Sequence, residues 1–256
     1  MISLYPDTWQ DLQDKVCEIL KQCHFSAEVG KKLESIRNGI EIDVFAEELI
    51  DDRQYSIICE CKYWKSSIPQ LHVHALRTVV SDTGVNKAYI ITTSDFQKGA
   101  INSVENTNIE LITWEEFQKL FFISWYKNYF SVKLHEIIKQ GYDPAAIQFF
   151  DNFELIEKKY FRSLIEKYHC LMEISNHFPH PILKNFPLQF KDIDDKLPLS
   201  KKMESSQIED WNLISCQILE KILLETTYSE FLRLLNDFAK PIYNELDKLN
   251  LYIDND

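Results

Sequence analysis

Glycine is scarce in this chain, and the phosphate-binding loops that depend on glycine are missing. Only 5 of the 256 residues are glycine. Neither GxGxxG nor GxxxxGK[ST] occurs in the sequence, and both motifs need glycine because the backbone must approach a phosphate closely. We therefore do not expect nucleotide binding of the dinucleotide or P-loop kind.

Paired cysteines and long hydrophobic runs are also lacking. The six cysteines are scattered, with no C-x-x-C pair, so no disulfide framework is indicated. The longest apolar cluster, residues 120–123, is far too short to span a bilayer. The first residues have neither the basic start nor the apolar segment of a secretory signal. These features predict a cytoplasmic protein in a reducing compartment, without membrane contact.

The chain has no excess of positive charge. It holds 28 Lys and Arg against 40 Asp and Glu, a formal net charge of -12. Residues 1–120 contribute -7 and residues 121–256 contribute -5, so neither half is a basic DNA-gripping module. Any DNA binding should therefore be weak and salt-sensitive, unless self-assembly or a partner protein brings the substrate to the chain.

The hydrophobic pattern of the first half alternates between helical and extended periods. It predicts helices over residues 9–23, 69–81 and 97–106 and from residue 114 onward, and strands over residues 40–46, 55–62, 88–93 and 109–113. The polar residues 48–54 are expected to form the turn of a hairpin. Alternating helices and strands predict an α/β fold with a central mixed sheet covered on both faces.

The second half has a different pattern. After about residue 120, apolar residues recur mostly at helical spacing, which predicts an all-α region. Four of the eight prolines fall between Pro179 and Pro198, and they predict a connector at about residues 177–200 within this region. We therefore predict two domains, residues 1–120 and residues 121–256.

The hairpin carries a group of charged residues that suits metal-dependent chemistry. Asp43 lies on its first strand, and Glu60 and Lys62 end its second. Side chains alternate along a strand, so Glu60 and Lys62 share a face, and pairing of the strands can bring Asp43 close to them. Two carboxylates suit Mg²⁺ or Mn²⁺, which would polarise a phosphate and activate a water with help from Lys62. Spacing alone fits a solvated hairpin with one cross-strand ion pair equally well.

Several ordered segments around this group resemble the Mrr-type restriction endonuclease domain of the PD-(D/E)XK nuclease superfamily. They are Ile42-Asp-Val-Phe, Cys59-Glu-Cys-Lys-Tyr-Trp-Lys, and the segments 73–84, 89–100 and 109–117. The resemblance covers roughly residues 8–120 and implies a three-layer α/β/α core and metal-dependent hydrolysis of DNA phosphodiesters that leaves 5′-phosphates. By position it makes Asp43 and Glu60 metal ligands, the Cys61 backbone carbonyl a third ligand, and Lys62 the catalytic lysine.

The resemblance also points to residues that support the site. Some relatives carry Gln-x-x-x-Lys on the following helix, where this chain has Gln70 and His74, which share one helical face with Arg77. That face can touch the DNA backbone, or it can be an ordinary polar surface. Arg37, just before the first strand of the hairpin, is a further candidate for phosphate contact. Relatives have a glutamate on the first helix, for which the candidates here are Asp14 and Glu18.

The residues and the resemblance together predict a metal-dependent DNA endonuclease. A restriction or anti-phage defence effector is the most natural setting, with the C-terminal helices forming a homo-oligomer or binding a partner protein. The alternative is a catalytically silent nuclease-like module that recruits a partner protein. The presence of Asp43, Glu60 and Lys62 favours the enzyme, because an inactive relative is expected to lose one of them. Action on RNA or on single-stranded junctions stays open.

Overall fold

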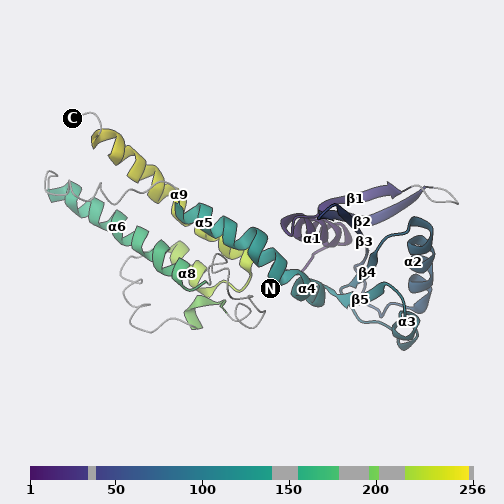
Figure 1. Cartoon of the computed structure of the whole chain (residues 1–256). Coiled ribbons are helices and arrows are strands. Elements are labelled where there is room, and N and C mark those ends of the chain that lie inside the picture. Colours follow the sequence, from purple (N-terminus) through teal and green to yellow (C-terminus); the bar gives the residue numbers. More distant parts are fainter. Residues whose placement is uncertain (34–38, 140–154, 179–195, 202–216, 254–256) are drawn as a thin grey trace. The chain divides into compact units, whose positions relative to one another are not determined.

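The chain folds into two compact units, which are shown in the computed structural model of Figure 1. The structure describes residues 1–33, 39–139, 155–178, 196–201 and 217–253. The first unit comprises Met1 and residues 3–129, and the second comprises Ile2 and residues 130–256. The first unit is α/β and the described part of the second is helical, as the hydrophobic pattern predicts. Most of the expected proline-rich connector at residues 177–200 lies outside the described residues.

A mixed five-stranded sheet forms the centre of the first unit. Its strands follow one another in the order β1-β2-β3-β4-β5, and their bounds are β1 (Ser26–Leu33), β2 (Ile40–Ile50), β3 (Arg53–Lys62), β4 (Lys87–Thr92) and β5 (Ile109–Thr113). Strands β1, β2 and β3 pair antiparallel, whereas β3, β4 and β5 pair parallel. The expectation of a mixed sheet is confirmed.

The hairpin is longer than the sequence predicts, and it has a further strand beside it. Strands β2 and β3 continue to Ile50 and from Arg53, so the turn shrinks to Asp51 and Asp52, which have φ values of 47° and 62°. Two consecutive residues with positive φ match the turns that suit the twist of a hairpin. Strand β1 was not predicted at all, because it is a largely exposed edge strand with little apolar alternation.

Helices cover both faces of the sheet. Helices α1 (Trp9–Gln22) and α4 (Trp114–Trp125) contact each other and the strands on one face. Helices α2 (Gln70–Thr83) and α3 (Lys98–Ser103) pack together on the other face (Figure 1). Capping fixes where α1 and α4 begin, because Thr8 and Thr113 accept hydrogen bonds from backbone N–H groups of the first turn. The three-layer α/β/α core is confirmed.

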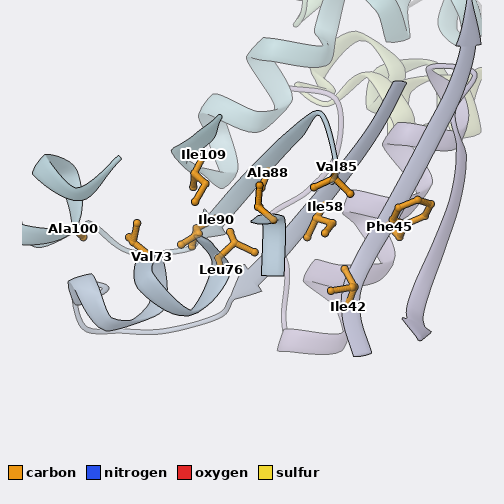
Figure 2. Close-up of a cluster of buried hydrophobic side chains, with 11 residues drawn as sticks. Ile42, Phe45, Ile58, Val73, Leu76, Val85, Ala88, Ile90, Ala100 and Ile109 are labelled. Carbon is orange, nitrogen blue, oxygen red and sulfur yellow. The ribbon is translucent and has the colours of Figure 1, made fainter. Parts of the chain in front are cut away.

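The core under α2 determines which way the functional side chains of β3 point. Phe45, Ile58 and Ile90 of the sheet belong to one buried hydrophobic cluster with Val73 and Leu76 of α2 (Figure 2). Ile58 is fully buried, and side chains two residues apart share a face, so Glu60 and Lys62 lie on the same side of β3 as Ile58. If β3 paired one residue out of register, Glu60 and Lys62 would point into the buried layer under α1. Burying these charges would cost much folding free energy.

The second unit is helical throughout its described part. It contains α5 (Ser131–Lys139), α6 (Leu155–Asn176), α8 (Gln217–Leu224), α9 (Tyr228–Ile253) and the 3₁₀ turn Leu199–Lys201. Helix α9 contacts α5, α6 and α8. A π-helical turn, Tyr126–Phe130, follows α4. The ring of its last residue, Phe130, packs with those of Phe178 and Tyr228 at centroid distances of 5.1 Å. None of the described helices combines the length and apolar character needed to cross a membrane.

Candidate active site

The hairpin brings Asp43 next to Glu60 at the point where β2 leaves β3. The last paired residues there are Val44 and Cys59, and the same register continued by one step places Asp43 opposite Glu60. Beyond this point the Asp43 side chain replaces the β2 backbone as the hydrogen-bond partner of β3. Its Oδ2 accepts a hydrogen bond from the Cys61 backbone N–H at 2.8 Å. The backbone of β3 therefore holds the Asp43 carboxylate beside Glu60.

Lys62 completes the group from the same face of β3. Its Nζ forms an ion pair with Glu60 Oε1. The Lys62 side chain is 15% exposed and that of Glu60 is 29% exposed, so both remain partly accessible from solvent. Glu60 and Lys62 both act on the ionisation of Asp43. The structure thus brings together all three side chains that the sequence singled out.

Burial and the repulsion of the nearby Glu60 charge disfavour the ionised form of Asp43. The pKa of Asp43 is raised, first by burial and then by the charge of Glu60. The Cys61 N–H, the Lys62 ammonium and the Gln13 side chain act in the opposite direction. A divalent cation placed between the carboxylates would relieve this repulsion, because it favours the ionised form of both.

The backbone of Cys61 offers a further oxygen at the same place. The Lys62 carbonyl accepts a hydrogen bond from the Thr93 N–H at 3.1 Å, so the backbone of Lys62 faces β4. Backbone groups of successive strand residues point to opposite edges, so the Cys61 carbonyl, like its N–H, points toward Asp43. The Cys61 thiol is buried, and burial raises its pKa well above the usual range.

The donor set fits a hard divalent cation. Two carboxylates and one carbonyl are oxygen ligands, and Mg²⁺ commonly takes one or two carboxylates and completes its shell with water and phosphate oxygens. In the described part of the chain, no group of three or more His, Cys, Asp or Glu side chains is arranged to hold a metal ion. A cation here would therefore depend on the carbonyl and on water as well as on the two carboxylates.

One contributor to this site was missed by the sequence analysis. Gln13 of α1 is only 9% exposed, and its side chain hydrogen-bonds the Asp43 carboxylate. The residues named as first-helix candidates, Asp14 and Glu18, are both exposed. The sequence signal for Gln13 is its place beside the apolar stripe of Leu12 and Val16. A glutamine buried there needs a hydrogen-bonding partner.

The candidate phosphate-contacting residues of α2 face α3. The Arg77 guanidinium donates a hydrogen bond to the Ser103 carbonyl. Gln70 Oε1 lies 2.8 Å from the position that a Cβ on Gly99 would occupy, so Gln70 also lies against α3. His74, between them on the same face, is exposed. Arg37 lies outside the described residues.

Comparison with known proteins gives a family match for the first unit. The family model described as a restriction endonuclease matches residues 7–121. A solved protein of unknown function, AF1548, is 20% identical over 42% of this chain and 59% of its own, with a TM-score of 0.37. The DNA modification-dependent restriction endonuclease AspBHI is 11% identical over 48% of this chain and 39% of its own, with a TM-score of 0.30. No curated protein sequence matches the chain significantly.

Proposed function

Since residues 7–121 form a restriction-endonuclease-like domain, which implies a nuclease, we propose that this protein is a metal-dependent endonuclease that hydrolyses DNA phosphodiester bonds. One observation carries the proposal. Asp43 and Glu60 meet at the end of the hairpin, with the Cys61 N–H bonded to Asp43 and with Lys62 paired to Glu60. A family match in which these side chains lay far apart would support the fold but not the chemistry.

Asp43, Glu60 and the Cys61 carbonyl are the proposed ligands of Mg²⁺ or Mn²⁺. When bound, such a cation polarises the scissile phosphate and lowers the pKa of a coordinated water. The pKa of Asp43 is raised first by burial and then by the charge of Glu60, and a bound cation would offset both effects. Gln13 and the Cys61 N–H keep the Asp43 carboxylate oriented toward the site.

Lys62 is the proposed catalytic lysine. Its ammonium has three donors, of which Glu60 engages at least one. The remaining donors can hold the attacking water and a non-bridging phosphate oxygen, where they offset the negative charge that develops during attack. Lys62 lies at the end of β3, and its side chain is only 15% exposed. The surrounding protein therefore limits the directions in which the ammonium can point.

We further propose how DNA reaches the site. Gln70, His74 and Arg77 of α2, together with Arg37, are candidates for contact with the DNA backbone, and Arg77 would then exchange the Ser103 carbonyl for a phosphate oxygen. The first 120 residues carry a net charge of -7, so these contacts alone give weak binding. We propose that the helical second unit supplies a homo-oligomer or binds a partner protein. A cytoplasmic restriction or anti-phage defence effector is the proposed setting.

Nicking of supercoiled plasmid tests the proposal. We expect the wild-type protein to nick DNA in Mg²⁺ or Mn²⁺ but not in EDTA, and to leave 5′-phosphates that DNA ligase can reseal. Glu60→Gln and Lys62→Ala should each lower the rate by about 100-fold or more, because each removes a group that stabilises transition-state charge. Glu47→Gln is the matched control, since Glu47 lies on β2 at the far end of the hairpin and accepts from Gln54 at 2.8 Å.

Two results would contradict the proposal. Equal nicking by all four proteins would place the activity elsewhere or in a contaminant. If none of the four proteins nicks DNA in Mg²⁺ or Mn²⁺, either as a monomer or as an oligomer, the catalytically silent interaction module would be the better account.

A further inference from the structure

Three exposed aromatic side chains lie on the two segments next to the end of β3. Tyr63 and Trp64 directly follow Lys62 in the chain and are each 38% exposed, and Tyr5 is 44% exposed. Consecutive Cα atoms are about 3.8 Å apart, so the Tyr63 and Trp64 backbones lie one and two steps from the catalytic lysine. We call Tyr5, Tyr63 and Trp64 the aromatic surface.

Thr93, which follows β4, ties the aromatic surface to the sheet. Its backbone N–H donates to the Lys62 carbonyl at 3.1 Å, and its hydroxyl donates to the Trp64 carbonyl at 3.2 Å. Its own carbonyl accepts a hydrogen bond from the Tyr5 hydroxyl at 2.8 Å. Tyr63 is also close enough to Tyr5 to contribute to the raised pKa of Tyr5, after burial and Glu115. One residue thus fixes the positions of both segments that carry these rings.

The Trp64 ring has a defined orientation of its own. It packs edge-to-face against His72, with ring centroids 4.9 Å apart and an interplanar angle of 90°. The loop behind it is also held, because Ser94 Oγ donates to the Ser66 carbonyl at 2.9 Å. Rings that are exposed but already positioned lose little conformational entropy when a ligand binds to them.

The location of the aromatic surface favours the substrate of the site as its ligand. It lies beyond the carboxyl ends of β3 and β4, which pair parallel. Ligands of open α/β sheets bind outside the carboxyl ends of parallel strands. Glu60 and Lys62 occupy the same end of β3, so a strand whose phosphate reaches them would place a neighbouring nucleotide near these rings.

The charge of the domain favours stacking over phosphate contact. Residues 1–120 carry a net charge of -7, and the Lys62 ammonium is already paired with Glu60. Stacking of a base on an aromatic ring requires no net positive charge and is available to every base. Bases inside a duplex already stack on each other, so only an unpaired base can offer its face to a side chain.

We propose that the exposed Trp64 ring of the aromatic surface stacks on an unpaired base next to the scissile phosphate, so that the protein binds single-stranded or locally unpaired DNA more tightly than duplex DNA. This inference rests on the proposed function, because it places the scissile phosphate at Asp43, Glu60 and Lys62. It adds the class of DNA that the site accepts.

Binding of labelled DNA to the full chain tests the inference. Fluorescence anisotropy is measured in Ca²⁺, used in place of Mg²⁺ to slow cleavage, with a 20-nucleotide strand lacking self-complementarity and with the same strand annealed to its complement. We expect wild type to prefer the single strand. Trp64→Ala should weaken single-strand binding by roughly 5- to 150-fold, the range for loss of one stacked base. Trp64→Phe should retain most of the affinity.

The matched control is Tyr55→Ala. Tyr55 is also an exposed aromatic of β3, 36% exposed, but it lies near the start of the strand, close to the hairpin turn. We expect this variant to bind both DNAs as wild type does. Circular dichroism and thermal melting confirm that Trp64→Ala remains folded, since loss of its contact with His72 affects a loop at the surface.

The outcomes separate this inference from the proposed function. Unchanged single-strand binding by Trp64→Ala, or an equal loss for single strand and duplex, would overturn the stacking. Tighter, Trp64-dependent binding of an RNA strand of the same sequence would overturn the assignment to DNA. In parallel, plasmid nicking that does not depend on Glu60 would overturn the proposed function, whereas Glu60-dependent nicking with Trp64-independent binding would overturn only the stacking.

Discussion

Replacing Asp43 with asparagine is expected to make the metal-free protein more stable while abolishing cleavage. Asparagine has nearly the same shape, and its Oδ1 can still accept the Cys61 N–H that Asp43 accepts at 2.8 Å. What Asp43→Asn removes is one negative charge that faces Glu60 in a partly buried place. Burial and Glu60 both raise the pKa of Asp43, so the folded protein disfavours the ionised form that is present at neutral pH.

The pH dependence has a definite sign. The folded-state pKa of Asp43 lies above its usual value of 3.8, so the folded state binds the proton more tightly than the unfolded state does. The contribution of Asp43 to wild-type stability therefore falls as the pH rises through the window between these two pKa values. Below pH 3.8 both states are protonated, and wild type and Asp43→Asn should have similar stability. Above this pH window, the difference in stability between Asp43→Asn and wild type should reach its full size.

The magnitude follows from the cross-strand geometry. Like charges that face each other across an antiparallel pair cost about 0.2–1 kcal/mol. A change of 1 kcal/mol shifts the Tm of a unit of this size by about 4 °C. We therefore expect Asp43→Asn to melt about 1–4 °C higher than wild type at pH 7 in EDTA. Mg²⁺ should raise the wild-type Tm, because a ligand that binds only the folded state stabilises it, and should raise that of the variant less.

Differential scanning calorimetry of the full chain measures these shifts. Asp14→Asn is the control, because Asp14 is an exposed carboxylate on α1, and its Tm should match that of wild type. The reasoning is refuted if Asp43→Asn melts below wild type in EDTA at pH 7. It is also refuted if Mg²⁺ raises the Tm of both proteins equally.

Two further predictions concern the surroundings of the site. Gln13→Ala should slow plasmid nicking by roughly 2- to 12-fold, because it removes a hydrogen bond to Asp43 worth about 0.5–1.5 kcal/mol, whereas Asp14→Ala should nick as wild type does; equal rates would contradict the role of Gln13. The five described cysteines are buried, and burial raises the pKa of Cys23 to about 12, so the native protein at pH 8 should react with a disulfide reagent at no more than one thiol. Rapid reaction of two or more thiols before denaturation would contradict that burial.

The sheet and the charged group could be predicted because they follow from local patterns. Period-two alternation placed Asp43 and Glu60 on strands, and the apolar run ending at Cys59 fixed the buried face of β3. The antiparallel register, continued one step beyond Val44 and Cys59, brings the two carboxylates together. The roles of these residues in catalysis remain predictions that the experiments above test.

The parts that could not be predicted depend on contacts between distant segments or on weak patterns. Strand β1 is an exposed edge, so its sequence carries little apolar signal. Gln13 reaches Asp43 from a different element, and nothing in the period of α1 specifies that partner. The role of Thr93 in holding Lys62, Trp64 and Tyr5 likewise exists only once three segments meet. Such contacts are long-range, and a single sequence does not encode them as a local pattern.

Anomalous diffraction from crystals grown with Mn²⁺ tests the central claim most directly. The account predicts a manganese peak within about 2–2.5 Å of carboxylate oxygens of Asp43 and Glu60 and of the Cys61 carbonyl oxygen, next to the Lys62 ammonium. A protein that nicks DNA in Mn²⁺ but binds manganese elsewhere, or shows no peak between these two carboxylates, would contradict it.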